Sequence, residues 1–314
     1  MAISMARQGH AVTLWGHNPE HLELLAKERC NRQFLPKTIF PDTLFINNSL
    51  EDVVTQHSFI MLGVPSHAFR ETLIKCKPYL KPDALVTWIT KGFETDTGLL
   101  THEVAWQVLG LDTDIALISG PSFALEVADN LPTAVTVASP KLSVAEQVAD
   151  TLRDTYFLTF PTTDIASAEI GGSIKNILAI AAGISDGIGY GANARAALIT
   201  RGLAEMVQLG NVYGCSEGSF LGLAGVGDLV LTCTDDKSRN RRLGLQLGKN
   251  IDRETAVKNI GQEVEGIHAA KEVYQLIKKH QLDMPICLQV YRVLFQGLAP
   301  KYAVRTLLVL AKSI

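Results

Sequence analysis

The chain has 314 residues, which is enough for about two domains of ordinary size. Hydrophobic residues make up 47% of it and charged residues 19%, a composition that excludes a disordered protein. Its 29 basic residues nearly balance its 32 acidic ones. The net charge of −3 therefore gives no general attraction to nucleic acid or anionic lipid, and any anion must be bound by a local basic cluster.

The first half of the chain alternates short apolar runs with segments of helical spacing. The runs predict strands at Ala11–Trp15, Phe59–Val64, Leu85–Thr90, Ile115–Ser119, Thr133–Ala138 and Tyr156–Phe160. The segments between them predict helices at His21–Arg29, Ala68–Lys75, Leu99–Val108 and Val144–Thr151. Strands that are apolar throughout are typical of a sheet covered on both faces. We therefore expect an α/β domain over residues 1–164, built on a mostly parallel, doubly wound sheet.

The second half is rich in Ala, Leu, Gly and Ile with a period near 3.6 residues. It predicts helices at Ser173–Gly183, Ala194–Gly210, Arg241–Leu247, Gly266–His280 and Cys287–Phe295. We expect an all-helical domain over residues 165–314. No flexible linker separates the halves, so a ligand cleft is expected between them.

The first residues have an unusual order. Met1–Arg7 has the pattern of a helix that Gly9 ends, and the first predicted strand follows at once. Because a helix that feeds a parallel strand normally follows an earlier strand, we expect the chain to begin inside a βαβ unit.

The cysteines and the apolar segments indicate a cytosolic protein. The five cysteines are scattered and form no metal-binding spacing, so reduced thiols are expected. The most apolar stretch, Ile177–Ile184, is too short to span a membrane. We predict no transmembrane helix, secretory signal or metal site, and the histidines show no metal-binding motif.

Two isolated charges mark the second half. Lys175 is the only charged residue in the apolar stretch 170–185, and Asp228 is the only one in 221–231. A lysine there either extends to the surface or serves as a proton donor in a cleft. An aspartate there either caps a helix or pairs with a buried lysine.

Polar and basic residues indicate where an anion binds. Lys237, Arg239, Arg241 and Arg242 surround Ser238 and Asn240 just before a predicted helix. This arrangement suits a phosphate monoester, although a solvated basic loop has the same composition. Lys91, Gly120 and Ser122 follow predicted strands, at the sheet edge where ligands usually bind. Ordinary turns also use such residues.

Taken together, these segments resemble the NAD(P)-dependent glycerol-3-phosphate dehydrogenases of the bacterial cytoplasmic type. The resemblance runs through most of the chain, in VPSH at 64–67, TKG at 90–92, SGPSFALEV at 119–127, GGSIKNILAIAAGISDG at 171–187, ANARAALITRGLAEM at 192–206, GDLVLTCTDDKSRNRR at 227–242 and GQEVEG at 261–266. It implies a Rossmann-like dinucleotide-binding domain followed by an all-α substrate domain.

The resemblance also implies roles for individual residues. Lys175 is expected to be the catalytic proton donor and acceptor. The residues expected around the substrate are Lys91, Gly120, Ser122, Lys175, Asp228, Ser238, Arg239 and Asn240, and those expected along the dinucleotide are His17, Lys91, Ala124, Arg239, Glu263 and Glu265. The implied reaction interconverts dihydroxyacetone phosphate and sn-glycerol 3-phosphate and supplies glycerophospholipid synthesis.

The sequence and the resemblance also lead to expectations for the cofactor and the oligomeric state. His17 and Asn18 stand where an NAD-specific enzyme usually has a carboxylate. We therefore expect NADPH to be used, with NADH as the alternative, and the resemblance implies a homodimer. We therefore expect a nicotinamide cofactor and a small phosphorylated substrate, and we expect no metal.

One departure from the family leaves alternatives open. The family opens with a strand and a G-x-G-x-x-G turn that holds the pyrophosphate, and the chain lacks both before its first predicted strand. We expect the protein that begins at Met1 to fold poorly and to bind dinucleotide weakly. The alternatives are a related hydroxy-acid dehydrogenase and a non-catalytic relic of the enzyme.

Overall fold

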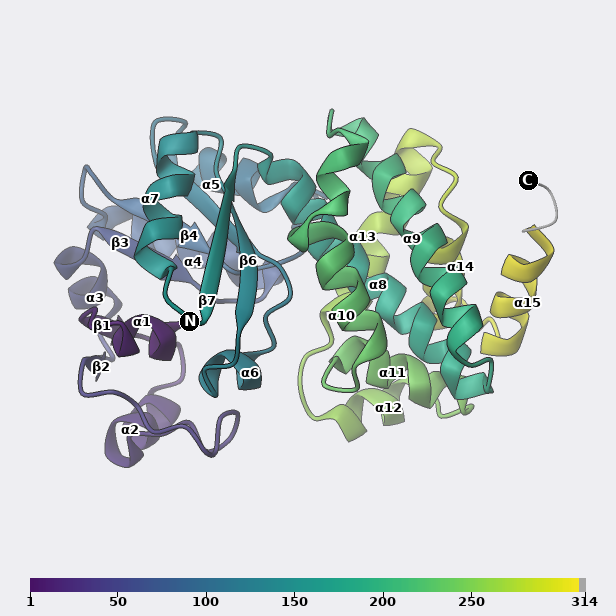
Figure 1. Ribbon diagram of the computed structural model, residues 1–314, viewed down its shortest axis with the longest axis horizontal. Coiled ribbons are helices and arrows are strands. Elements are labelled where there is room, and N and C mark those ends of the chain that lie inside the picture. The colour runs from purple at the N-terminus through teal and green to yellow at the C-terminus, as the bar shows by residue number, and fades with distance from the viewer. Residues whose placement is uncertain (311–314) are drawn as a thin grey trace.

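The computed structural model describes residues 1–310 of the protein. The sheet-bearing half and the helical half lie side by side, with the long helix α8 (Ile165–Ile188) beginning where they meet (Figure 1). The strands of the first half are β1 (Val12–Leu14), β2 (Leu44–Ile46), β3 (Phe59–Leu62), β4 (Leu85–Trp88), β5 (Asp114–Ser119), β6 (Thr133–Ala138) and β7 (Phe157–Thr162). The helices between them are α1 (Ala2–Arg7), α2 (Pro19–Glu28), α3 (Leu50–Gln56), α4 (Ser66–Cys76), η1 (Lys77–Tyr79), α5 (Thr101–Leu109), α6 (Ala124–Ala128) and α7 (Leu142–Leu152).

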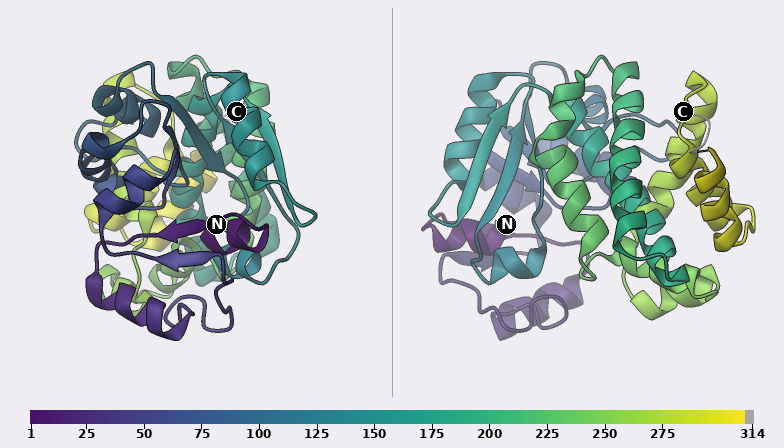
Figure 2. Two further views of the ribbon diagram at one scale, coloured as in Figure 1. Left: turned by 90° about the vertical axis from the view of Figure 1, so that its left-hand side faces the viewer. Right: turned by 45° about the vertical axis from the view of Figure 1, so that its right-hand side comes forward.

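The strands form a parallel pair and a larger sheet instead of one continuous sheet. β1 pairs with β2, and the larger sheet has the order β3-β4-β5-β6-β7. Side chains connect the two parts: Met5, Val12 and Met61 belong to one hydrophobic cluster, and His57 Nε2 lies 3.0 Å from Thr13 Oγ1. Figure 2 shows the β1–β2 pair beside α1 and apart from the longer strands.

The larger sheet is mixed, because β6 runs antiparallel to β5 while its other pairs are parallel. The chain enters β6 through α6, which has five residues and spans only about 7 Å. Parallel strands are usually joined by a helix that runs back along the preceding strand, and α6 is much shorter than the six-residue β5, which is roughly 20 Å long. The next strand therefore starts at the edge where β5 ends and runs in the opposite direction.

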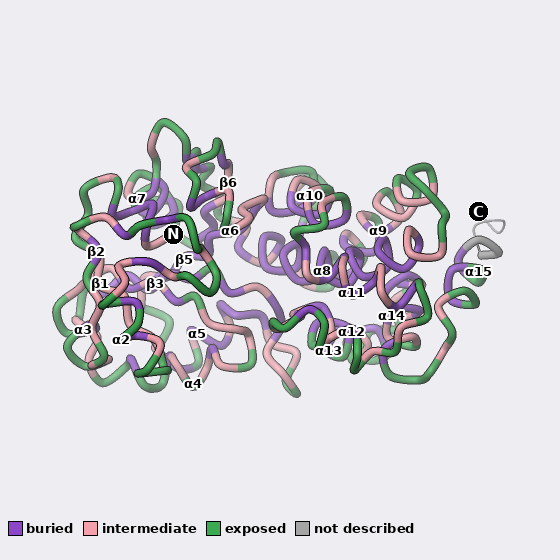
Figure 3. Tube along the Cα trace, turned by 90° about the horizontal axis from the view of Figure 1, so that it is seen from below, coloured by how far each residue is buried: buried purple, intermediate pink, exposed green. Residues whose placement is uncertain are grey.

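The second half is helical throughout the described residues. Its elements after α8 are α9 (Ala192–Val212), η2 (Glu217–Leu221), the π-helical segment η3 (Leu223–Gly227), α10 (Asp228–Thr234), α11 (Arg239–Gly248), α12 (Arg253–Ile260), α13 (Glu265–His280), α14 (Pro285–Phe295) and α15 (Pro300–Leu310). Figure 3 shows α8 as a buried helix along the middle of this half. α8 is long and apolar enough to cross a membrane, yet 94% of its most apolar window is buried inside the protein. It is the central helix of the core.

Glycines allow α8 and α11 to pack backbone against backbone. A Cβ added at Gly183 would lie 2.2 Å from the Arg241 carbonyl oxygen, and one at Gly244 would lie 2.1 Å from the Ile180 carbonyl oxygen. Gly187 is equally restricted, at 2.5 Å from the Leu245 carbonyl oxygen. This contact fixes the N-terminal end of α11 against α8.

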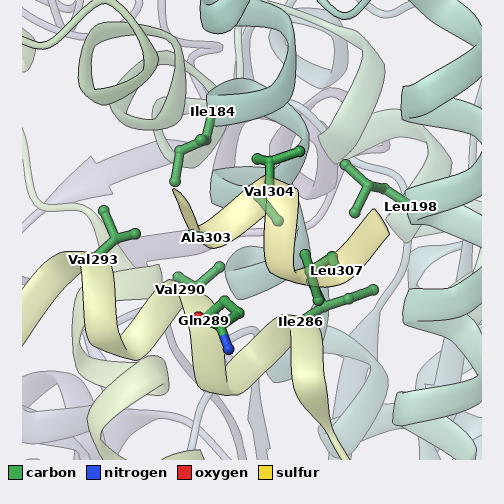
Figure 4. A pocket seen from close by; sticks show the side chains of 10 residues that line it. Ile184, Leu198, Ile286, Gln289, Val290, Val293, Ala303, Val304 and Leu307 are labelled. Carbon is green, nitrogen blue, oxygen red and sulfur yellow. The ribbon is translucent and has the colours of Figure 1, made fainter. Parts of the chain in front are cut away.

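A small apolar pocket lies beneath α15, remote from the sheet. Figure 4 shows Leu198, Ile286, Val290 and Leu307 converging on it from α9, α14 and α15. Its free volume is only about 10 Å³, which leaves room for a water molecule at most. It is a local packing gap rather than a ligand site.

The α8–α11 contact predicts the effect of a single methyl group. Gly244→Ala should destabilise the protein by roughly 1–3 kcal/mol, because the new Cβ overlaps the backbone of α8. Gly218→Ala is the matched control, since nothing lies within 4 Å of a Cβ added there, and its effect should be small. Urea denaturation measures both. Equal midpoints for the two variants would contradict the backbone contact.

Candidate active site

A cleft of about 260 Å³ lies between the two halves, near the carboxyl ends of β4 and β5. Both halves contribute polar and charged side chains to it. Its lining includes Lys91, Ser122, Phe123, Ala124, Lys175, Asn176, Thr232, Lys237, Ser238, Arg239, Asn240 and Glu265. Ligands of open α/β sheets bind at this edge, so the cleft is the candidate active site.

Two lysines that line the cleft share one buried carboxylate. Asp228 Oδ1 contacts Lys175 Nζ from α8, and Asp228 Oδ2 lies 2.7 Å from Lys91 Nζ, which follows β4. Only 2% of the Asp228 side chain is exposed, against 9% for Lys175 and 15% for Lys91. Asp228 is the first residue of α10, directly after η3. Of its two sequence interpretations, pairing with a buried lysine is the one observed.

Burial and these charges shift the acidities of the cluster. Burial lowers the pKa of Lys175 to about 8; the Asp228 carboxylate opposes this decrease, whereas the positive charge of Lys91 adds to it. Burial alone raises the pKa of Asp228, but the two lysines outweigh it and hold that pKa below its ordinary value. Lys175 can therefore change its protonation state close to neutral pH while Asp228 stays ionised.

Gly120 and Ser122 shape the sheet side of the cleft. The Gly120 carbonyl accepts hydrogen bonds from Lys91 Nζ at 3.2 Å and from Ser122 Oγ at 3.1 Å. Gly120 has φ +146°, and a Cβ there would lie 3.1 Å from Val135 Cα. Glycine is therefore required at this turn, which orients a backbone acceptor toward Lys91.

The N-terminal end of α11 brings Ser238, Arg239 and Asn240 to the opposite wall. Ser238 Oγ caps the helix by accepting from the Arg241 amide at 3.2 Å. Asn240 donates to Asn176 Oδ1 at 2.9 Å and accepts from the Gly266 amide at 2.9 Å. Both its side chain and that of Ser238 are therefore held in place.

Among the described residues, Arg239 differs from Ser238, Asn240 and Arg241 in having no fixed side-chain partner. Within residues 1–310 it makes no side-chain hydrogen bond or salt bridge, although it lines the cleft. By contrast, Arg241 pairs with Asp186 and Asp236. A guanidinium that projects into a cleft without a partner is suited to bind an anion with two parallel hydrogen bonds.

Two of the residues predicted along the dinucleotide do not line the cleft. His17 is exposed after β1, and Glu263 contacts His67 and His268. The structure also adds Asn176, Thr232, Lys237 and Phe123 to the predicted lining. Lys237 closes one end, where it pairs with Glu126 at 3.0 Å across the cleft. The basic cluster around Arg239 already indicated Lys237, whereas nothing in the sequence distinguishes Thr232 from other helical threonines.

A Rossmann-like half, an all-helical half and a cleft with a buried lysine between them are typical of the two-domain nicotinamide-dependent dehydrogenases. Family models agree: the N-terminus of NAD-dependent glycerol-3-phosphate dehydrogenase matches residues 1–145, and the C-terminus of the same enzyme matches residues 164–305. The chain belongs to the family of the NAD-dependent glycerol-3-phosphate dehydrogenases. This result confirms the predicted family, enzyme class and nicotinamide cofactor.

Individual relatives match over nearly the full length. The chain is 50% identical over 309 residues to glycerol-3-phosphate dehydrogenase [NAD(P)+] of Methylococcus capsulatus, covering 98% of this chain and 92% of the relative. It is 47% identical to the enzyme of the same name from Escherichia coli K12, covering 98% and 91%. The crystal structure of glycerol-3-phosphate dehydrogenase from Coxiella burnetii superimposes with a TM-score of 0.95 at 44% identity, covering 98% and 94%.

These matches do not bear out the expectation that the chain begins too late. The family's N-terminal model matches from residue 1, and the structure forms the expected first helix, strand and Gly9 turn. The identities near 50% over the whole chain also favour the predicted function over a related hydroxy-acid dehydrogenase.

The lysine–aspartate cluster predicts a large loss of stability when its carboxylate is neutralised. Asp228→Asn should cost about 3–5 kcal/mol, because two buried ammonium groups lose their counter-ion. The control is Asp150→Asn, which removes an exposed pair with Arg153 and should have little effect. Urea denaturation at pH 7 measures both. A stability of Asp228→Asn equal to that of the control would contradict the ion cluster.

Proposed function

We propose that the chain interconverts dihydroxyacetone phosphate and sn-glycerol 3-phosphate in this cleft, with Lys175 as the proton donor and acceptor. The observation that carries the proposal is a lysine with a pKa of about 8, buried beside Asp228 and lining the cleft that holds the unpartnered Arg239. One group suits proton transfer near neutral pH, and the other suits a phosphate. The family of the chain supports the same reaction.

Lys175 acts at the oxygen on the reacting carbon. A nicotinamide held in this cleft would supply the hydride in reduction and receive it in oxidation. During reduction, Lys175 Nζ donates its proton to the developing alkoxide, and its positive charge stabilises that oxygen before the transfer is complete. During oxidation the neutral amine accepts the hydroxyl proton. Asp228 orients the lysine and Lys91 shares its carboxylate, so Lys175 stays in place in both protonation states.

Arg239, Ser238 and Asn240 bind the phosphate of the substrate. The guanidinium of Arg239 supplies charge and two parallel donors, while the two neighbours contribute fixed polar groups at the start of α11. Lys91, Gly120 and Ser122 lie on the sheet side, close to the reacting carbon. In this proposal the charged end of the substrate lies on the helical half and its carbonyl lies near Lys175.

The residues present fit a dinucleotide along the same cleft. Ala124 and Glu265 line it from the two halves, together with Lys91 and Arg239. For His17 and Glu263 the assignment rests on the resemblance alone. Because an exposed histidine stands after β1 where NAD-specific enzymes usually have a carboxylate, we infer that NADPH is used and that NADH is the weaker alternative.

The wider role follows from the product. sn-Glycerol 3-phosphate is the backbone on which glycerophospholipids are built, so we place the enzyme in the cytoplasm as a supplier of lipid synthesis. We also infer a homodimer. Its support, apart from the resemblance, is the outward face of the edge strand β7, where Leu158 and Phe160 are each about half exposed.

The role of Lys175 predicts opposite pH profiles for the two directions. Reduction requires the ammonium form, so its kcat/KM should decrease as the pH rises through about 8; oxidation requires the amine and should increase over the same range. Lys175→Ala should lower kcat by about 10²–10⁴-fold in both directions. Nicotinamide absorbance from pH 6 to 10 measures these changes. A variant that keeps the wild-type kcat would rule out the role of Lys175.

The role of Arg239 predicts a specific loss of substrate affinity. Arg239→Ala should weaken binding of glycerol 3-phosphate about ten- to a hundredfold, since a hydrogen bond to a charged group contributes about 1.5–3 kcal/mol. Arg242→Ala is the control, because Arg242 follows on the same helix but does not line the cleft. Protection against thermal unfolding by glycerol 3-phosphate measures the affinity. Unchanged protection in Arg239→Ala would place the phosphate elsewhere.

A further inference from the structure

Two histidines and a glutamate meet outside the cleft, where the two halves of the molecule come together. His67 lies in the first turn of α4 in the sheet-bearing half. Glu263 precedes α13, and His268 lies in its first turns, in the helical half. None of the three lines the cleft. The proposed reaction does not use the two histidines, and Glu263 is connected to the dinucleotide by resemblance alone. They are far apart in the sequence, which explains why no metal-binding spacing appears there.

The potential ligand atoms of these three residues are already close together. Glu263 Oε1 lies 3.2 Å from His67 Nδ1 and 3.7 Å from His268 Nε2. The potential ligand atoms of all three lie within 4.8 Å of one another. Zinc binds nitrogen and oxygen at about 2.0–2.2 Å, so ligand atoms of a tetrahedral site are about 3.3–3.5 Å apart. Small side-chain rotations therefore suffice to coordinate an ion.

The donor set and its exposure favour a particular class of ion. Two imidazoles with one carboxylate suit zinc and its neighbours in the transition series, whereas magnesium prefers oxygen ligands alone. The His67, Glu263 and His268 side chains are 48%, 32% and 47% exposed, so an ion can enter from solvent and keep a water as fourth ligand. The five cysteines are buried and do not compete for it.

We propose that His67, Glu263 and His268 bind one divalent ion of the zinc class, which ties α4 to α13 and thereby joins the two halves. Without the ion, these residues form only exposed side-chain contacts, which contribute little to stability. With the ion, each half supplies at least one ligand. Separation of the halves on unfolding must then release the metal, and the bound ion stabilises the folded protein.

Zinc titration of the full chain, freed of metal with a chelator, tests the site. We expect one Zn²⁺ per chain by calorimetry, a higher Tm with Zn²⁺, and no comparable binding of Mg²⁺. Affinity should be lower at pH 6 than at pH 7.5, because protons compete for the imidazole nitrogens. Co²⁺ in place of Zn²⁺ should give the visible absorption of a four- or five-coordinate site.

Single variants assign the ligands. His67→Gln and His268→Gln should each weaken Zn²⁺ binding at least tenfold and remove most of the increase in Tm. His280→Gln is the matched control, an exposed histidine in the last turn of the same helix, and should bind as the wild type does. Metal-free His268→Gln should keep its dehydrogenase activity, which shows that the variant is folded.

Three results would overturn the proposal. The first is a chain that binds no Zn²⁺, and the second is a His268→Gln variant that binds it as tightly as His280→Gln. The third is unchanged binding in His67→Gln, which would place the ion on the helical half alone and remove the connection between the halves. Equal binding of Mg²⁺ would contradict the assignment to the zinc class.

Discussion

The site depends on one buried carboxylate that must neutralise two ammonium groups from different halves of the molecule. Without the Asp228 carboxylate, Lys175 and Lys91 would be buried with no negative charge to compensate theirs. The three groups together carry one excess positive charge, which favours an anionic substrate and a developing alkoxide. The same electrostatic arrangement therefore holds the two halves in register and prepares the site for the chemistry.

The apolar surroundings give this cluster its properties. Lys175 lies on a helix whose other residues are almost all uncharged and buried, and that burial lowers its pKa to about 8. The opposite wall, at the N-terminal end of α11, is organised differently. There Asn240 bridges Asn176 and the Gly266 amide, so hydrogen bonds fix the neutral donors while Arg239 remains available for the ligand. The roles proposed for Lys175 and Arg239 thus rely on two different local environments in the same cleft.

The sequence predicts those parts of the fold and site in which a residue or a segment differs clearly from its neighbours along the chain. Lys175 and Asp228 stand out because each interrupts an apolar segment, and most strands and helices follow from hydrophobic period. β2 and α3 were not predicted, since three and seven residues are too few for a clear period. The division of the sheet and the reversal of β6 depend on how the connecting segments pack, which the residue pattern does not encode. Asn176 and Thr232 are uncharged and do not stand out from the other residues of their helices. Only their position beside the cleft therefore identifies them.

The glycine contact between α8 and α11 has a consequence for how this enzyme tolerates change over evolutionary time. Side chains do not set the distance between these helices, because carbonyl oxygens of one helix face glycines of the other at Gly183, Gly187 and Gly244. Substitutions among the surrounding aliphatic residues can therefore accumulate without altering the spacing between Lys175 on α8 and Arg239 on α11. These glycines carry no functional group, and yet their contact fixes the relative position of the two helices that carry Lys175 and Arg239.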